Sequence, residues 1–132
     1  MNYPNDILYA KTHEWVKDQK DGTALIGISD FAQNALGDIV YIEFLCDDED
    51  VVPKGEPICE VESVKASESV YAPISVRVLK VNSELEENEY KEVNKSCYKN
   101  GWLIKADILD KIQLNDLLDA QKYKEFCEKQ EN

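Results

Sequence analysis

The chain has 132 residues, 43% of them hydrophobic, and carries 27 acidic against 15 basic side chains, for a formal net charge of −12 at pH 7. This length predicts one ordinary domain across 1–132 with one modest core. The acidic balance argues against nucleic acid as a partner, because phosphate binding requires a basic face, and no apolar run approaches the length of a membrane span.

The first clear elements are a strand and a short helix. A β-branched, apolar run predicts a strand at 23–28. Ser29 or Asp30 is a suitable N-cap for a helix near 29–36, whose apolar residues recur at helical spacing. Gly37 follows the last of them, in the position where glycine commonly ends a helix.

The rest of the body reads mostly as short strands. We expect them at 38–44, 58–62, 70–72, 77–81 and 102–106. The first of these is partly apolar on both faces and is expected to lie in the centre of its sheet. Residues 82–95 are polar and are predicted to form a loop. Short strands separated by turns suggest a small barrel or sandwich.

The period of the apolar residues changes near the C-terminus. From Ile112 to Phe126 they recur at helical intervals, with Asn115 or Asp119 as a candidate cap. The sequence therefore predicts a β body at about 9–108 and a helical tail at about 112–128.

Lys65 stands between two strand-like apolar segments. Most lysines are solvated surface charges, and this is the default interpretation. However, apolar or small neighbours replace the Gly, Asn or Asp that a turn tip normally prefers, and Glu68 adds an acidic flank. An enzyme could therefore recognise and acylate Lys65. The recognition turn would comprise Glu62, Ser63, Val64 and Ala66.

A catalytic alternative rests on the thiols. Cys46, Cys59, Cys97 and Cys127 are widely spaced, with no C-x-x-C pair. Two disulfides are conceivable, but we expect reduced structural thiols. An enzyme that used Cys97 or Cys127 as nucleophile would have to pair it with His13, the only histidine, and zinc spacings cannot be written with one histidine.

Several motifs, in order, resemble the H protein of the glycine cleavage system. They are Tyr9 to Val16, Gly27 to Gln33, Leu36 to Glu43, Val61 to Ala66, Tyr71 to Ser75 and Gly101 to Lys105. The match runs from about Tyr9 to Ala106, and the helical ending from Leu117 to Cys127 is also similar. The methionines that flank the lysine of biotin carriers are absent.

The resemblance implies a mainly β, barrel-sandwich hybrid fold, as in lipoyl domains. It also implies that lipoate is attached to Lys65 by an amide bond, placed there by a lipoate ligase or lipoyl transferase. The cofactor would do the chemistry and the protein would have no catalytic residues of its own. The arm would receive the aminomethyl group of glycine from the P protein, visit the tetrahydrofolate-dependent T protein, and be reoxidised by the flavin-dependent L protein.

The same resemblance implies a cleft that shelters the loaded arm. Thr12 and Glu14 match residues of that cleft, and the Glu14 carboxylate could pair with the cationic aminomethyl group. The alternative is that Glu14 is an ordinary surface acid. Where the family usually has Ser-Asp, this chain has Glu68-Ser69, so Ser69 replaces an expected aspartate and Glu68 compensates only if it faces inward.

Three further expectations remain open at this point. An H-like scaffold that relays lipoate to other enzymes, without glycine turnover, is the alternative function. Only eight residues precede Tyr9, which favours a bacterial cytoplasmic chain over the mature form of a mitochondrial matrix protein. The acidic surface either aids solubility alone or docks onto basic patches of protein partners.

Overall fold

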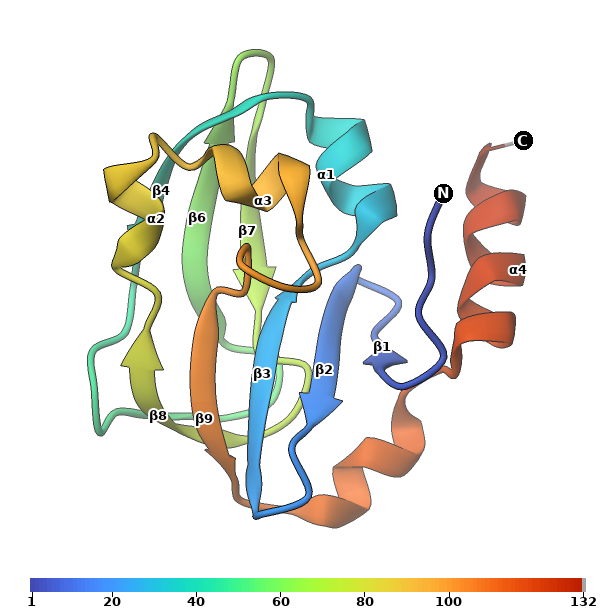
Figure 1. Cartoon of the computed structure of the whole chain (residues 1–132). Helices are drawn as coiled ribbons and strands as arrows, with labels where there is room; N and C mark the ends of the chain where they lie inside the picture. The colour runs from blue at the N-terminus through green and yellow to red at the C-terminus, as the bar shows by residue number, and fades with distance from the viewer. Residues whose placement is uncertain (132) are drawn as a thin grey trace.

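Two antiparallel sheets form the body of the protein. The computed structural model of the chain describes residues 1–131 and contains nine strands (Figure 1). The larger sheet has the order β1 (Leu8–Tyr9), β2 (Glu14–Asp18), β3 (Thr23–Ile28), β9 (Ile104–Ile108), β8 (Val76–Val81) and β5 (Val51–Val52). The smaller sheet consists of β4 (Ile39–Phe44), β6 (Pro57–Ser63) and β7 (Ser67–Tyr71), with β6 in the centre.

The core lies between the two sheets. Cys59 and Val61, two positions apart on β6, point inward and are fully buried, as are Ile26 and Ile104, which pair across β3 and β9 in the larger sheet. These side chains belong to one continuous hydrophobic cluster that draws residues from both sheets. The predicted mainly β sandwich is confirmed.

Helices cover both ends and one side of the sandwich. They are α1 (Asp30–Leu36), α2 (Glu84–Glu87), α3 (Lys91–Lys95), the 3-10 helix η1 (Lys111–Asp116) and α4 (Ala120–Glu131). Ser29 caps α1, because its Oγ accepts a hydrogen bond from the Ala32 N–H (3.2 Å), and Gly37 ends α1 with φ +80°. The predicted helix near 29–36 is confirmed. Figure 1 shows α1 and α3 at the end from which the β6–β7 hairpin protrudes.

Three expectations about the strands are corrected. Strand β4 is an edge strand with Val40 and Tyr41 exposed, so its two apolar faces do not indicate a central position. Residues 82–95 contain α2 and α3, which form because Leu85 and Val93 are buried in the core. The last strand begins at Ile104, and β1, β2 and β5 were not predicted as strands.

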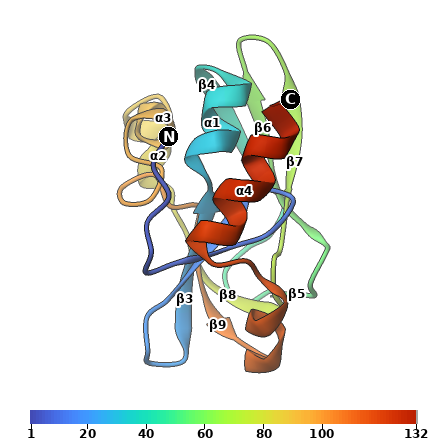
Figure 2. The ribbon, with the colours of Figure 1, turned by 90° about the vertical axis from the view of Figure 1, so that its right-hand side faces the viewer.

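The helical tail consists of two helices rather than one. Leu118 interrupts it by pairing with Tyr9 in an isolated bridge. Asp119 then caps α4, accepting a hydrogen bond from the Lys122 N–H (2.9 Å). Through Tyr123 and Cys127, α4 packs on a second, smaller hydrophobic cluster, and Figure 2 shows it lying in front of the sandwich beside α1.

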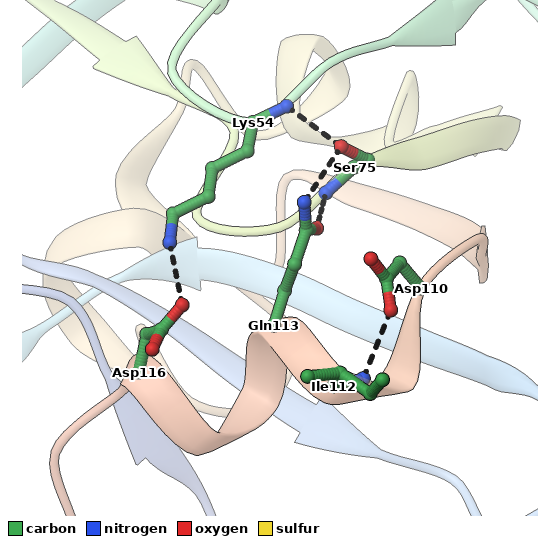
Figure 3. A network of polar contacts seen from close by, with 6 residues as sticks. All are labelled: Lys54, Ser75, Asp110, Ile112, Gln113 and Asp116. Atoms are coloured by element: carbon green, nitrogen blue, oxygen red, sulfur yellow. Dashed lines mark hydrogen bonds and ion pairs between the residues drawn. The ribbon is translucent and has the colours of Figure 1, made fainter.

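Helix η1 is fastened to the end of the sandwich opposite the hairpin (Figure 1). Gln113 accepts a hydrogen bond from the Ser75 N–H (2.6 Å) and donates one to Ser75 Oγ (3.2 Å), as Figure 3 shows. Lys54 donates its N–H to the same Ser75 Oγ (3.0 Å) and pairs its Nζ with Asp116 (3.2 Å). This network holds η1 against the end of the sandwich that lies away from the β6–β7 hairpin. Lys65 lies at the other end, in the hairpin turn.

Candidate functional site

Lys65 is exposed in the short turn that joins β6 to β7. The Ser63 hydroxyl organises this turn: its Oγ accepts hydrogen bonds from the N–H groups of Lys65 (3.2 Å) and Ala66 (3.0 Å) and donates to the Ala66 carbonyl (3.1 Å). The Val64 N–H donates to the carbonyl of Asp38 (3.0 Å), which anchors the turn to the start of the neighbouring strand. The backbone of the turn is therefore braced from two sides, while the Lys65 side chain is left free for chemistry.

A cavity of about 340 Å³ opens on the Ala66 side of this turn. It has three walls: the loop that leads into β2, one face of α1, and the start of β7. Its lining residues are Thr12, His13, Glu14, Ile28, Phe31, Ala32, Ala35, Leu36, Ala66, Glu68, Ser69 and Val70. The residues of α1 recur at i, i+1, i+4 and i+5, so a single helix face supplies the apolar wall.

Glu14 is the one acidic side chain in this cavity that is fully withdrawn from solvent, with 1% of its surface exposed. Its carboxylate accepts hydrogen bonds from the Thr12 hydroxyl and from the Tyr71 N–H (3.2 Å). Burial raises the pKa of Glu14 to about 7, although both hydrogen bonds act in the opposite direction. The alternative that Glu14 is an ordinary surface acid is wrong.

The structure brings all four residues expected to form the cleft to one cavity. Thr12 and Glu68 are exposed at its rim, and Ser69 is half-buried. Ser69 donates its hydroxyl to Glu60 (2.5 Å), so its proton is already engaged. Glu68 does line the cavity, and its carboxylate supplies a negative charge that Ser69 lacks.

His13 also lines the cavity, but its contacts are structural. Its ring stacks on Phe31 (centroids 4.7 Å apart), and its Nδ1 lies 2.6 Å from the Tyr123 hydroxyl. Burial lowers the pKa of His13, so the ring is neutral at pH 7. Sequence reasoning missed the apolar wall, which the helical spacing of Phe31, Ala32 and Ala35 could have indicated, and it missed Tyr123, for which no local signal exists.

The thiols are poorly suited to nucleophilic chemistry. All four cysteines are reduced thiols and are buried. Burial raises the pKa of Cys97 to about 12 and that of Cys46 to about 11, and it also raises the pKa of Cys59. Within residues 1–131, no three His, Cys, Asp or Glu side chains gather to hold a metal ion. Over the same range, no helix has the length and apolar character to cross a membrane.

Comparisons with known proteins agree on one family. The sequence profile described as "Glycine cleavage H-protein" matches residues 7–130. The glycine cleavage system H protein of Alteromonas mediterranea is 48% identical over 122 residues, covering 92% of this chain and 93% of that protein. The one from Halothermothrix orenii is 43% identical over 131 residues, covering 99% and 100%. The crystal structure of the Mycobacterium marinum H protein superposes with a TM-score of 0.81 at 30% identity, covering 91% of this chain and 94% of that one.

Proposed function

Because the chain belongs to the glycine cleavage H-protein family, we propose that Lys65 carries lipoate in an amide bond and that the protein is a carrier with no catalytic residues of its own. The single observation that supports this most is an exposed lysine on a braced turn, beside a cavity with one buried carboxylate. The whole of 1–132 would then serve as one lipoyl-carrier domain.

The residues around Lys65 fit such an attachment. Its side chain is exposed, so a lipoate ligase or lipoyl transferase can reach the amine, and amide formation removes the lysine charge without burying it. Glu62, the last residue of β6 but one, is exposed, and the Val64 side chain is 69% exposed. With Ser63 and Ala66, they form the surface that an attaching enzyme would read.

When bound, the lipoyl group supplies the reactive dithiolane to which the aminomethyl group of glycine is transferred. This chain holds the cargo. The apolar face of α1 would pack against the hydrocarbon part of the arm. The Glu14 carboxylate would pair with the ammonium of the cargo, with Thr12 holding the carboxylate in place. Glu68 would add a second negative charge at the rim in place of the family's aspartate.

When no cargo occupies the cavity, the Glu14 carboxyl group would carry a proton part of the time. With a pKa of about 7, Glu14 is partly protonated at neutral pH, and a cation beside it favours the charged form. Binding of an ammonium group there would therefore displace the proton and convert a poorly solvated acid into an ion pair. The buried position of such a pair would keep water from the cargo.

The partners would be the P, T and L proteins of the glycine cleavage system, together with the enzyme that attaches lipoate. A net charge of −12 suits brief, electrostatically steered docking onto basic surfaces better than permanent interfaces. The relatives come from bacteria, which supports a bacterial cytoplasmic location.

Intact-mass spectrometry tests the attachment. The unmodified protein is incubated with lipoate, ATP and a lipoate ligase, and the modified peptide is then mapped. We expect one lipoyl group on Lys65 and none on a Lys65→Arg variant. Lys91→Arg, which alters another exposed lysine near the same hairpin, should be lipoylated as the wild type is. Modification of the Lys65→Arg variant would contradict the proposal.

A second assay separates glycine cleavage from the relay of lipoate to other enzymes. The lipoylated protein is supplied to the P protein, and the exchange of bicarbonate with the glycine carboxyl group is measured. We expect exchange that depends on Lys65. Lipoylation without any exchange would favour the relay scaffold over the carrier of the aminomethyl group.

A further inference from the structure

Tyr123 is one of the residues through which helix α4 contacts the walls of the cavity. Its side chain is completely buried, and its hydroxyl lies 2.6 Å from His13 Nδ1 and 2.6 Å from Ser29 Oγ. Its ring stacks on Tyr9, with centroids 4.4 Å apart and an interplanar angle of 3°. The ring is thus held by the small hydrophobic cluster, and the hydroxyl is aimed at two polar partners.

Each of these partners belongs to a different wall of the cavity. His13 lies in the loop between Thr12 and Glu14, and its backbone adopts the left-handed conformation (φ +78°). Ser29 is the N-cap of α1, which supplies the apolar wall. The hydroxyl of Tyr123 therefore joins the carboxylate-bearing loop to the helix that faces it.

We propose that Tyr123 is a positioning residue of the cavity: its hydroxyl fixes the distance between the Glu14 loop and α1, and so determines how well the loaded arm is sheltered. This inference rests on the proposed function, because it assigns a role in the cleft to a residue that touches neither the arm nor its cargo. It makes α4 part of the site.

The hydrogen bonds around this hydroxyl form one consistent chain of donors and acceptors. With Nδ1 as the unprotonated nitrogen of a neutral His13 ring, that atom accepts the Tyr123 proton, the Tyr123 oxygen accepts the Ser29 proton, and Ser29 Oγ accepts the Ala32 N–H. Cys127, one helical turn along α4, contacts the same hydroxyl. Every proton in the chain has an acceptor, so the arrangement favours one geometry for both walls.

The loop and the helix also meet near this point through a backbone hydrogen bond, from the Ser29 N–H to the His13 carbonyl (2.9 Å), and through the stacking of the His13 ring on Phe31. The backbone bond fixes where the two segments meet, and the stacking sets the tilt of the ring without any directional polar contact. The Tyr123 hydroxyl adds the hydrogen bonds that tie the His13 ring to the cap of α1. Removing it should let the walls move apart while the fold is kept.

The test compares Tyr123→Phe with Tyr9→Phe. The first variant keeps the stacked ring and loses only the bridge. The second loses a hydroxyl of the same cluster, which bonds to the Pro4 carbonyl (2.8 Å) and to Tyr98 and does not join the Glu14 loop to α1. The first readout uses the unmodified protein: the amide NMR shifts of Thr12 and Ala35, one in each wall, should change in Tyr123→Phe and not in Tyr9→Phe.

The second readout uses the lipoylated protein, loaded with the aminomethyl group and separated from its partners. The release of ammonia should be faster in Tyr123→Phe than in wild type by about fivefold, the equilibrium effect of one hydrogen bond. The rate in Tyr9→Phe should equal that of wild type. Attachment of lipoate should proceed at the wild-type rate in both variants, because neither alters the Lys65 turn.

The possible results distinguish the two proposals. The first possible result is that the folded wild type releases ammonia more slowly than the urea-unfolded protein, and Tyr123→Phe releases it as slowly as the wild type. In that case only the role of Tyr123 is overturned. Equal acceleration in both variants would also overturn it, because loss of stability alone would then explain the effect. If the wild type gives no shelter, the cleft of the proposed function fails and the role of Tyr123 fails with it.

Discussion

The Cε atom of Lys65 lies 3.6 Å from the position that a Cβ atom on Gly37 would occupy. The stem of the lysine thus passes over the glycine that ends α1. Gly37 has φ +80°, a conformation that side chains with a Cβ adopt only with strain. One residue therefore ends the helix and leaves an open surface beneath the lysine.

Gly37→Ala should lower the free energy of unfolding by about 1 kcal/mol, because of the positive φ. It should also slow lipoylation slightly, because the added methyl group packs at van der Waals distance against the lysine stem and restricts it. Gly22→Ala is the control: it has φ +91° and no atom within 4 Å of its Cβ position. Urea unfolding should show similar losses in both variants, whereas the lipoylation rate should fall only for Gly37→Ala. Equal lipoylation rates would show that the open surface is unimportant.

Ser63→Ala should loosen the turn that carries Lys65. The substitution removes a hydroxyl that makes three hydrogen bonds within the turn. Because the turn is exposed, we expect a loss of only about 0.5–1 kcal/mol in stability. Hydrogen exchange at the amides of Lys65 and Ala66 should be faster. Ser67→Ala, at an exposed site where β7 begins, should leave this exchange as it is in wild type.

Glu14→Gln should change how stability depends on pH. The pKa of Glu14 is about 7 in the folded protein against 4.5 for a free side chain, so the folded state holds its proton more tightly. Wild-type stability should therefore fall as pH rises between these two values, by on the order of 2–3 kcal/mol. Glutamine carries no charge at any pH, so the variant should lack this component.

Urea unfolding near pH 5 and near pH 8 measures this difference. Glu68→Gln serves as the control, because it removes an exposed carboxylate from the rim of the same cavity. Its pH dependence should follow that of the wild type. A parallel pH dependence for wild type and Glu14→Gln would contradict the burial of Glu14 as the source of the effect.

Gly27→Ala should disturb the packing of Trp15. A Cβ atom on Gly27 would lie 2.8 Å from three atoms of the Trp15 indole, which is fully buried. The ring would have to shift away from the Cys97 carbonyl, to which its Nε1–H donates (3.1 Å). We expect a loss of about 1–3 kcal/mol by urea unfolding.

The combination of Gly27→Ala with Trp15→Phe tests the cause. Phenylalanine lacks the atoms that collide, so the double variant should lose less stability than the sum of the two single variants. Strictly additive losses would mean that the cost of Gly27→Ala does not come from its contact with Trp15.

Local signals were sufficient for part of the fold. The N-cap at Ser29, the glycine at 37 and the apolar run at 58–62 are each determined by neighbours in sequence, and the predictions there are confirmed. Strand β2 was missed because Glu14, Trp15 and Val16 are buried in succession, which breaks the usual alternation. For Glu14, that burial is offset by the N–H of Tyr71 in the other sheet, which donates to the Glu14 carboxylate (3.2 Å).

The candidate site, too, was predictable from local sequence only in part. The turn at Lys65 stood out by its own residues, whereas the cleft residues Thr12, Glu14, Glu68 and Ser69 followed from the family resemblance. Helix α3 could not be predicted, because it is short and is held by Asn94, which accepts from the Ile39 N–H (2.9 Å) and donates to the Gly37 carbonyl (2.9 Å). Contacts between residues this far apart in the chain leave no periodic pattern.

The hydrogen bonds that hold the Lys65 turn affect how partner enzymes would reach this lysine. Since the Ser63 hydroxyl and the Asp38 carbonyl hold the backbone of the turn, movement at this tip falls mainly to the Lys65 side chain and to the arm that we propose for it. Each enzyme must then approach the same tip of the molecule. The P, T and L proteins would therefore compete for this protein one at a time, and the order of their visits would be set by affinity for the cargo state rather than by a standing assembly.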